Sequence, residues 1–219
     1  MTPFDSLRSL RAGLSRDAVP SVDHDMNRDL ELAVVERLRH GDPEAFDIVF
    51  EAYRARVYSF LVRLSRHRDL ADDLLEETWV RLVANASTLR PDTRLAAWLL
   101  TVARNLYWTH CRARRIDEDA RGSIGLWPAV PADPSPYEVA MGHELQDRIE
   151  RAIARLPLRY REALLLVAVE GLTPGEAAAT CGVSPEALRQ RLSRARAMVA
   201  RELALMETTT VPRTREVVT

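Results

Sequence analysis

Five arginines stand close together near the carboxyl end of the sequence, in the segment SPEALRQRLSRARAMVAREL at residues 184–203. This segment has no acidic residue between Glu186 and Glu202. Surface helices often alternate the sign of their charges, because opposite charges four residues apart attract each other. Guanidinium groups at this density repel one another, and nucleic-acid phosphates would relieve that repulsion. A merely solvated charged face is the alternative, and the pattern favours binding of duplex DNA.

The elements around these arginines have the signals of a helix-turn-helix. Thr173 and Glu176 have capping-box spacing at the start of a short helix, which Gly182 can end in the left-handed conformation. Ser184 and Pro185 then begin a longer helix. Its apolar residues lie within about 80° of one another, so the arginines occupy the remaining face. This apolar seam consists of Leu188, Leu192, Ala195, Val199 and Leu203.

A second basic helix is predicted from about Leu95 to Arg115, with five arginines and no acidic residue between Thr93 and Arg115. An aromatic ring among arginines suits the stacking of unpaired bases; packing of Trp108 under a neighbouring loop is the alternative. The predicted core seam is Leu95, Trp98, Leu99, Val102 and Leu106, and the residues opposite it are Arg104, Trp108, Cys111 and Arg115.

The preceding helix, predicted from about Asp69 to Val83, has the opposite charge. Because carboxylates do not sit against phosphates, this face should look away from DNA, toward a basic protein partner. A solvated acidic face is again the alternative. The acidic residues are Asp69, Asp72, Asp73, Glu76 and Glu77.

The whole chain has 219 residues and a formal net charge of −1, so any attraction to nucleic acid must come from local charge. Helical periodicity predicts an all-α fold of two four-helix domains joined by a flexible linker. The expected parts are a disordered extension at 1–28, a first domain at 29–115, a Pro-rich linker at 116–137, a helix-turn-helix domain at 138–206 and a flexible tail at 207–219.

Some classes of function find no support in the sequence. The two cysteines, Cys111 and Cys181, belong to no Cys/His cluster, so we expect neither a metal site nor a disulfide. We expect no cofactor and no catalytic residue, because no phosphate loop or nucleophile motif is present. The longest apolar run, Ala163–Val169, is too short to span a membrane, so we expect a cytoplasmic protein.

Four segments, in order, resemble the bacterial RNA polymerase sigma factors of the extracytoplasmic-function type. They are DLADDLLEETWVRL, then AAWLLTVARNL with HCRARR, then LPLRYREALLLVAVEGLTPGEAA, then LRQRLSRAR. The resemblance covers roughly residues 29–115 and 144–203. It implies a protein that binds core RNA polymerase and directs transcription initiation at promoters. It also implies an anti-sigma factor as a further partner and no insertion into the membrane.

The resemblance assigns three sets of residues. The first domain would bind the clamp of the polymerase large subunit, and the flap region of the polymerase is implied as a further contact of the chain. The residues implied for the clamp are Asp69, Asp72, Asp73, Glu76 and Glu77. Those implied for the opened nontemplate strand of the −10 element are Asn85, Ser87, Thr88, Arg104, Asn105, Trp108, His110, Arg112 and Arg115. Those implied for the −35 duplex are Ser184, Ala187, Arg189, Gln190, Arg191, Arg194 and Arg196. In the family a small hydroxyl residue often stands where this chain has Ala187.

A stand-alone helix-turn-helix regulator is the alternative function. Its first domain would sense a signal or form a dimer. The acidic helix beside an aromatic and basic helix favours the sigma-factor interpretation.

Overall fold

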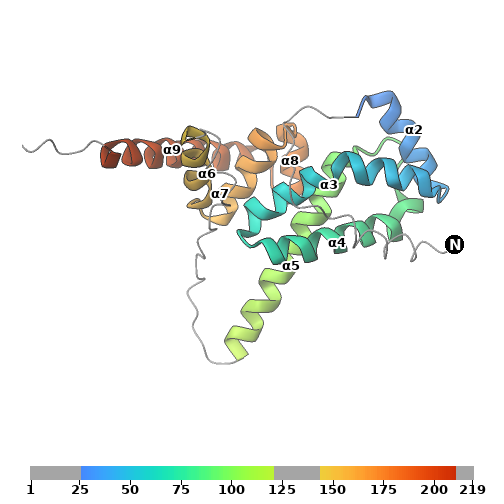
Figure 1. Ribbon diagram of the computed structural model, residues 1–219, viewed down its shortest axis with the longest axis horizontal. Helices are drawn as coiled ribbons and strands as arrows, with labels where there is room; N and C mark the ends of the chain where they lie inside the picture. The colour runs from blue at the N-terminus through green and yellow to red at the C-terminus, as the bar shows by residue number, and fades with distance from the viewer. Residues whose placement is uncertain (1–25, 121–143, 211–219) are drawn as a thin grey trace, which may run out of the picture. The chain divides into compact units, whose positions relative to one another are not determined.

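The computed structural model describes residues 26–120 and 144–210, and within them every regular element is helical. The helices between residues 28 and 120 form one compact unit, and those between residues 144 and 210 form another (Figure 1). The predicted all-α fold of two helical domains is therefore confirmed. Most of the predicted N-terminal extension, linker and tail lies outside the described residues.

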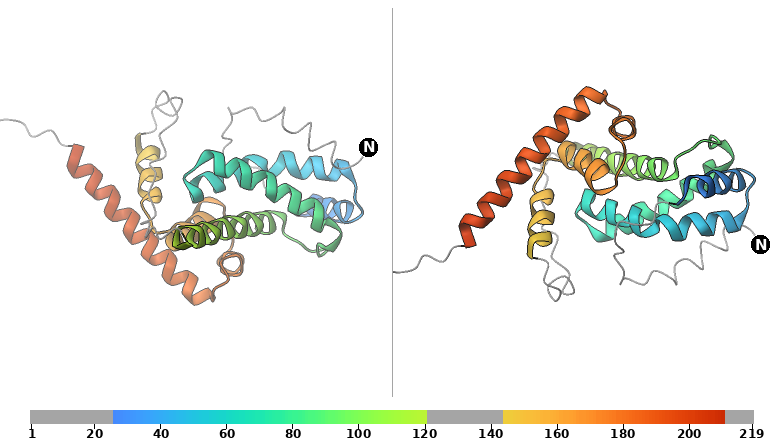
Figure 2. Two further views of the ribbon diagram at one scale, coloured as in Figure 1. Left: turned by 90° about the horizontal axis from the view of Figure 1, so that it is seen from below. Right: turned by 90° about the horizontal axis from the view of Figure 1, so that it is seen from above.

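The first unit contains α2 (Arg28–Arg39), α3 (Pro43–Ser65), α4 (Arg68–Asn85), the short 3₁₀ turn η1 (Ala86–Thr88) and α5 (Leu95–Ala120). Helices α3, α4 and α5 pack against one another, and α2 packs on α3 (Figure 2). Asp42 caps α3 by accepting a hydrogen bond from the Glu44 amide at 2.9 Å, and Pro43 takes the first helical position. These local signals fix where α3 begins.

An aromatic cluster fastens α3 to α4. Trp79 of α4 is 2% exposed, and its ring meets Phe50 edge-on with the two centroids 5.0 Å apart. Phe46 lies one helical turn before Phe50 and also contacts Trp79 edge-on, at 6.1 Å. Edge-to-face pairs of this kind contribute about 0.5–1.5 kcal/mol beyond the area that they bury. They hold α4 in a fixed rotation, which decides which of its side chains reach the surface.

The buried face of α5 differs from the predicted seam. Leu95 and Leu99 are buried as predicted, but Trp98, Val102 and Leu106 are only half-buried. At 100° per residue, the centre of the observed face is rotated by about 90° from the predicted one. Apolar residues surround the first turns of this helix almost completely, so periodicity alone could not select the side that α3 and α4 cover. The rest of the buried face consists of Leu100, Ala103, Tyr107 and Cys111.

The second unit contains α6 (Glu144–Ala154), α7 (Leu158–Leu164), the π-helical turn η3 (Leu165–Val169), α8 (Pro174–Cys181) and α9 (Pro185–Thr210). The long helix α9 packs against α6, α7 and α8. Its contact side includes Leu188, which lies with Leu165 and Leu166 among the fully buried side chains.

The turn between α8 and α9 follows the sequence signals. The Thr173 hydroxyl accepts from the Glu176 amide at 3.2 Å, and the Glu176 carboxylate accepts from the Thr173 amide at 2.9 Å. This is the predicted capping box. Gly182 has φ +63°, the left-handed conformation that ends α8. Helix α9 then starts with the Ala187 amide donating to the Ser184 hydroxyl at 3.2 Å.

Among the described helices, none combines the length and the apolar character that crossing a bilayer requires.

Candidate nucleic-acid interface

The inner side of α9 is the side that the sequence predicted. Leu188, Leu192 and Ala195 are buried, while Val199 and Leu203 are half-buried nearer the end of the helix. With that side in the core, the first turns of α9 leave a polar outer face. Arg189, Gln190 and Arg196 are exposed on it.

Arg191 does not lie on this outer face. Its guanidinium Nη1 is 3.1 Å from Oε1 of Glu162 on α7, and that carboxylate is 1% exposed. The Arg191 side chain itself is only 25% exposed. Its position on the outer part of the helix was therefore predicted wrongly. The partner lies 29 residues away, on a helix whose packing the sequence does not reveal. Arg191 fixes α9 on α7.

Arg194 is exposed on the outer face and also contacts α7. Its Nη1 donates a hydrogen bond to the hydroxyl of Tyr160 on α7 at 3.4 Å. This hydrogen bond lowers the pKa of Tyr160. Arg159 adds to the same positive cluster, since its guanidinium lies 4.7 Å from the centroid of the Tyr160 ring. The basic surface of the second unit therefore extends from α9 to the start of α7, which composition along α9 alone did not indicate.

Arg189 has an ion-pair partner that is itself exposed. It pairs with Glu186 one turn earlier at 2.7 Å, and both side chains are about two thirds exposed, 66% and 64%. Exposed pairs of this kind contribute about 0–1 kcal/mol, so a phosphate can replace the carboxylate at little cost. Of the other predicted residues, Ser184 is exposed and caps α9, and Ala187 is half-buried.

In the first unit, Arg104 and Trp108 of α5 form a stacked pair. The guanidinium carbon lies 5.5 Å from the centroid of the indole ring, and Nη1 of Arg104 is 3.1 Å from Oδ1 of Asn105. Such contacts hold an aromatic ring in a fixed orientation at the surface. Trp108 is half-buried, and Asn105 and Arg112 are exposed. Together they give α5 an outer face with a ring for stacking and a cation for phosphate.

Sequence reasoning placed Trp98 in the core, whereas the structure leaves it half-buried. At 100° per residue, Trp98 lies about 20° from Asn105 around the helix axis, so it belongs to the same outer face. The rotation of α5 described above is the reason. The signal that could have identified it is the i, i+7, i+14 spacing of Trp98, Asn105 and Arg112.

Two residues assigned to this face lie elsewhere. Cys111 is buried, and burial raises the pKa of its thiol, so its predicted place on the polar face is wrong. His110 lies about 160° around the helix from Arg112. Burial lowers the pKa of His110, as do the neighbouring Arg114 and His67, while Asp73 of α4 raises it. His110 therefore faces α4. Arg115 lies on α5, and its side chain is outside the part of the chain that the structure describes.

Asn85, Ser87 and Thr88, which the resemblance implied for the opened strand, lie from the last residue of α4 to the end of η1. We call residues 84–93 the base-reading loop; it begins at the end of α4 and runs through η1 toward the start of α5. Asn85 donates to the Arg81 carbonyl at 2.8 Å, and Thr88 donates to the Asn85 carbonyl at 2.8 Å. Ser87 is exposed between them, as is Arg90 after them. The hydroxyl and amide oxygens of Asn85 and Thr88 keep acceptor capacity, since these bonds use their hydrogens.

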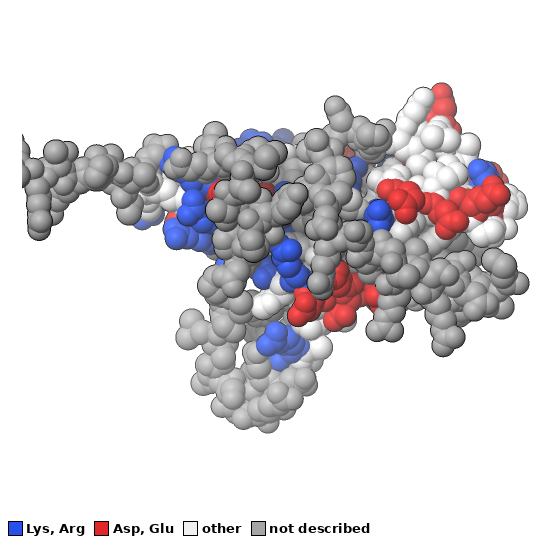
Figure 3. Space-filling view, viewed as in Figure 1, with Lys and Arg blue, Asp and Glu red and all other residues white. Residues whose placement is uncertain are grey.

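The predicted acidic face of α4 forms a continuous stripe on the surface. Asp69, Asp73 and Glu76 are exposed, at successive turns. Asp72 is half-buried, and Glu77 pairs with Arg81 at 2.8 Å. Figure 3 shows acidic side chains gathered on the side of the first unit that includes α4.

The same stripe continues into two exposed valines that the sequence interpretation missed. Val80 is 43% exposed and Val83 is 37% exposed. Val80 follows Glu76 by four residues, and Val83 follows Val80 by three. An apolar patch next to a charged stripe is typical of a protein interface. The missed signal was the i, i+4, i+7 series that runs from Glu76 to Val83.

Comparison with known proteins matches both units to one family. Residues 49–116 match the model of sigma-70 region 2, and residues 146–199 match that of sigma-70 region 4. ECF RNA polymerase sigma factor EcfG of Rhodopseudomonas palustris is 37% identical over 143 residues, which are 65% of this chain and 76% of that protein. RNA polymerase sigma factor CarQ of Myxococcus xanthus is 34% identical over 161 residues, 73% of this chain and 90% of that protein.

A solved structure is similar over most of this chain. The sigma factor RpoE of Bartonella quintana, crystallised with the anti-sigma factor NepR, aligns with a TM-score of 0.57 at 27% identity. The alignment covers 81% of this chain and 98% of that one. Two matched regions in the family's order, and relatives above 30% identity matched over most of their length, establish the relationship: the chain belongs to the ECF family of RNA polymerase sigma factors.

Proposed function

We propose that this sigma factor divides promoter recognition between its two units. As a member of its family, it directs transcription initiation at promoters. In the proposal, the second unit binds the −35 element as duplex, and the first unit holds the opened −10 strand and binds core RNA polymerase. The observation that carries the proposal is that each unit has one helix, α9 or α5, with its inner side in the core and a basic outer face.

For the duplex, α9 is the helix that enters the major groove. Gln190 lies in its second turn, where a side chain can reach base edges, and Arg189 lies beside it. Arg194 and Arg196 stand further along the helix and would hold phosphates. Arg191 is a positioning residue, because its ion pair with Glu162 fixes the rotation of α9 within the second unit.

For the opened strand, the outer face of α5 supplies the rings and the loop supplies the polar readers. Trp108, braced by Arg104, and Trp98 give two surfaces on which bases can stack, each stack contributing about 1–3 kcal/mol. Arg112 would hold a phosphate of the same strand. Ser87 and the acceptor oxygens of Asn85 and Thr88 would contact an unstacked base.

For core polymerase, the stripe on α4 combines charge with apolar area. Asp69, Asp73 and Glu76 would face basic residues of the polymerase clamp, and Val80 and Val83 would be buried in the contact. Charge sets the rate and orientation of such encounters, while apolar burial contributes most of the affinity. An anti-sigma factor, the partner crystallised with the Bartonella relative, belongs to the proposal as a regulator. A cytoplasmic location, where bacterial polymerase works, belongs to it as well.

The test is transcription by core polymerase with the purified chain on a template library of randomised sequence. Sequencing the transcript ends should reveal a common −10 and −35 pair upstream of the start sites. Transcripts without such a pair would contradict the proposal. A stand-alone regulator, the alternative function, would bind duplex DNA without associating with core polymerase.

The first prediction separates the α4 stripe from the DNA faces. The double variant Asp73→Lys, Glu76→Lys should weaken binding to core polymerase about tenfold or more, because it places like charges against a basic partner. Binding of the full chain to a −35 duplex should stay within twofold. The matched control is Asp47→Lys, Glu51→Lys, which reverses two exposed acids one turn apart on α3. Equal effects of the two double variants on core affinity would contradict the assignment of the interface.

A further inference from the structure

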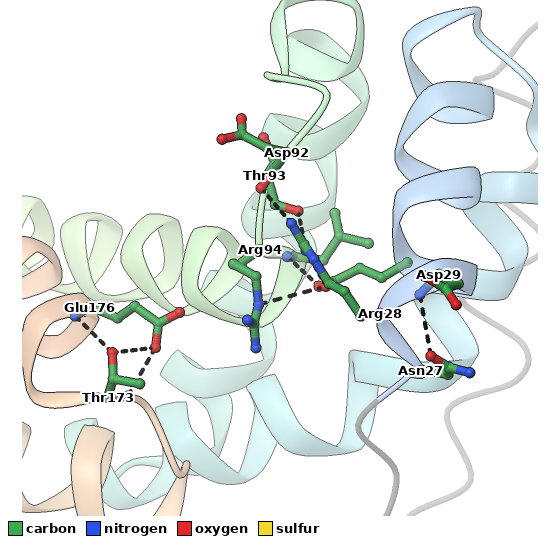
Figure 4. A network of polar contacts seen from close by, with 10 residues as sticks. Asn27, Arg28, Asp29, Asp92, Thr93, Arg94, Thr173 and Glu176 are labelled. Carbon is green, nitrogen blue, oxygen red and sulfur yellow. Dashed lines mark hydrogen bonds and ion pairs between the residues drawn. The ribbon is translucent and has the colours of Figure 1, made fainter.

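Helix α2 reaches the base-reading loop through a buried carboxylate. Glu31 is only 4% exposed, and its Oε1 accepts a hydrogen bond from the Leu95 amide at 2.8 Å. Figure 4 labels Arg28, Asp92, Thr93 and Arg94, which belong to the same network of polar contacts. Leu95 is the first residue of α5 and stands 64 positions further along the chain. An acidic side chain at this place satisfies one of the amides that a helix start leaves without a partner. Glu31 thus does for α5 what a local N-cap residue does for other helices.

Arg28 completes the connection. Its Nη1 lies 2.6 Å from Oε2 of Glu31 and 3.3 Å from the Thr93 carbonyl oxygen, and its Nη2 donates to the Asp92 carbonyl at 2.9 Å. Arg94 approaches the same carboxylate, with Nε 3.7 Å from Oε2. Side chains of α2 therefore fix the backbone at two successive carbonyls and at the first amide of α5. We call Arg28 and Glu31 the α2 clamp.

The other end of the loop rests on the same helix. The turn η1 packs against α2, and Leu89 just after it is buried. Ser87 within η1 and Arg90 just after Leu89 stay exposed. Helix α2 thus holds the loop at its beginning and at its end and leaves its polar tip open to solvent.

Stability alone is a poor explanation for this ion pair, in which the carboxylate side chain is 5% exposed and the guanidinium side chain 38% exposed. Removing a carboxylate from water costs about as much as its attraction to a nearby cation returns, and apolar residues of similar volume often stabilise as well. What charged partners add is a unique geometry, because four directed contacts define where residues 92–95 lie. A recognition loop that is already in its bound shape loses less entropy on binding and distinguishes similar ligands better.

We infer that Glu31 and Arg28 are positioning residues for the capture of the unpaired −10 base. This inference rests on the proposed role of the loop. It deepens that role by making base discrimination depend on two side chains of α2, a helix to which the proposed function assigns no contact with the strand. Loss of the clamp should reduce the preference among the four bases more than it reduces the overall affinity for the strand, because the α5 face provides most of that affinity.

The experiment uses the full chain bound to core polymerase. Its probes are single-stranded DNA oligonucleotides with the −10 segment of a promoter mapped as above, bearing each of the four bases at each position. Fluorescence anisotropy gives the affinity ratio between preferred and other bases. Glu31→Ala should reduce that ratio about tenfold and leave core affinity within twofold. Glu31→Gln should fall between, because its Oε1 can still accept from the Leu95 amide but has no charge for Arg28.

The control is Glu36→Ala, which removes an acid on α2 that pairs with Arg39 at 2.7 Å, outside the clamp. It should leave the base ratio unchanged. Hydrogen exchange gives a second readout without DNA: the amides of residues 86–95 should exchange faster in Glu31→Ala and not in Glu36→Ala. Arg28→Ala should share both effects of Glu31→Ala, since either change opens the same clamp.

The outcomes are distinguishable. A wild-type complex without base preference would contradict the proposed role of the loop, and the inference with it. A wild-type complex with a preference that Glu31→Ala and Glu31→Gln retain would contradict the inference alone. If the base ratio and core affinity fell together in both Glu31 variants, the clamp would serve folding of the unit rather than positioning of the loop, and the inference would be wrong.

Discussion

At the scale of single residues, internal ion pairs decide which arginines a DNA backbone can reach. On α9, Arg191 and Arg189 are only two positions apart but differ in their partners. Arg191 meets a carboxylate that is 1% exposed, whereas Arg189 meets one that is 64% exposed. The first pair is protected from solvent and orders the packing, and the second can be exchanged for phosphate. A count of positive charges along a helix therefore overstates the surface available for DNA.

The second prediction concerns this difference. Arg191→Ala should destabilise the second unit by about 2–3 kcal/mol, because it removes the guanidinium partner of a buried carboxylate. The figure lies below the usual range for a fully buried pair because the Arg191 side chain is a quarter exposed, 25%. Hydrogen exchange of the α7 and α9 amides in the full chain measures the change.

The matched control is Arg189→Ala, which removes an exposed arginine from the same helix. It should change stability by less than about 0.5 kcal/mol, as surface substitutions usually do. If Arg191→Ala were equally mild and weakened only DNA affinity, Arg191 would be a contact residue and not a positioning one.

At the scale of elements, local signals predicted the boundaries within the helix-turn-helix. The capping box of α8 and Gly182 after it act within a few residues of the chain, so the sequence shows them directly. What the sequence could not show was the rotation of α5, because apolar side chains almost surround its first turns. The pairs Arg191–Glu162 and Glu31–Leu95 were also beyond it, since each joins helices that only tertiary packing brings together.

The third prediction compares two glycines of the helix-turn-helix. Gly182→Ala should destabilise the second unit by about 1 kcal/mol, because φ is +63° there and a Cβ is strained in that conformation. An added Cβ would meet no atom within 4 Å, so the backbone conformation is the only source of the loss.

Gly175→Ala is the matched control, because Gly175 lies in the first turn of α8, also with no atom within 4 Å of an added Cβ, and its φ is not positive. This change should be neutral or stabilise by up to about 1 kcal/mol through helix propensity. Differential scanning calorimetry of the full chain measures both. Equal effects of the two substitutions would show that the turn imposes no special conformation.

At the scale of the whole molecule, two separate basic faces suit promoter DNA, which is double-stranded in one part and single-stranded in another. In the proposed function, one face meets paired DNA and the other a single strand, while core polymerase keeps both near the promoter. Neither contact needs to be tight alone, because the second binding event occurs at high effective concentration. The formal net charge of −1 means that attraction to nucleic acid must come from local basic surfaces and not from the charge of the chain as a whole.

The fourth prediction tests the basic surface of the second unit through the salt dependence of duplex binding. The logarithm of duplex affinity should fall linearly with the logarithm of salt concentration, and Arg196→Ala should reduce the slope by about 1, as expected for one lost phosphate contact. Arg155→Ala is the control, because it removes an arginine of the same unit that pairs with Glu202 at 2.7 Å. An unchanged slope in Arg196→Ala would remove Arg196 from the phosphate-binding surface.

The α2 clamp bears on how the family's recognition domains are prepared for study. The segment that matches sigma-70 region 2 starts at residue 49, inside α3, whereas Arg28 and Glu31 precede it. A recombinant fragment trimmed to the matched segment would begin α5 without the acceptor of its first amide. We expect specificity profiles collected on such a fragment to describe a less ordered base-reading loop than the full chain has. Dissection of this protein should therefore keep the chain from Asn27 onward.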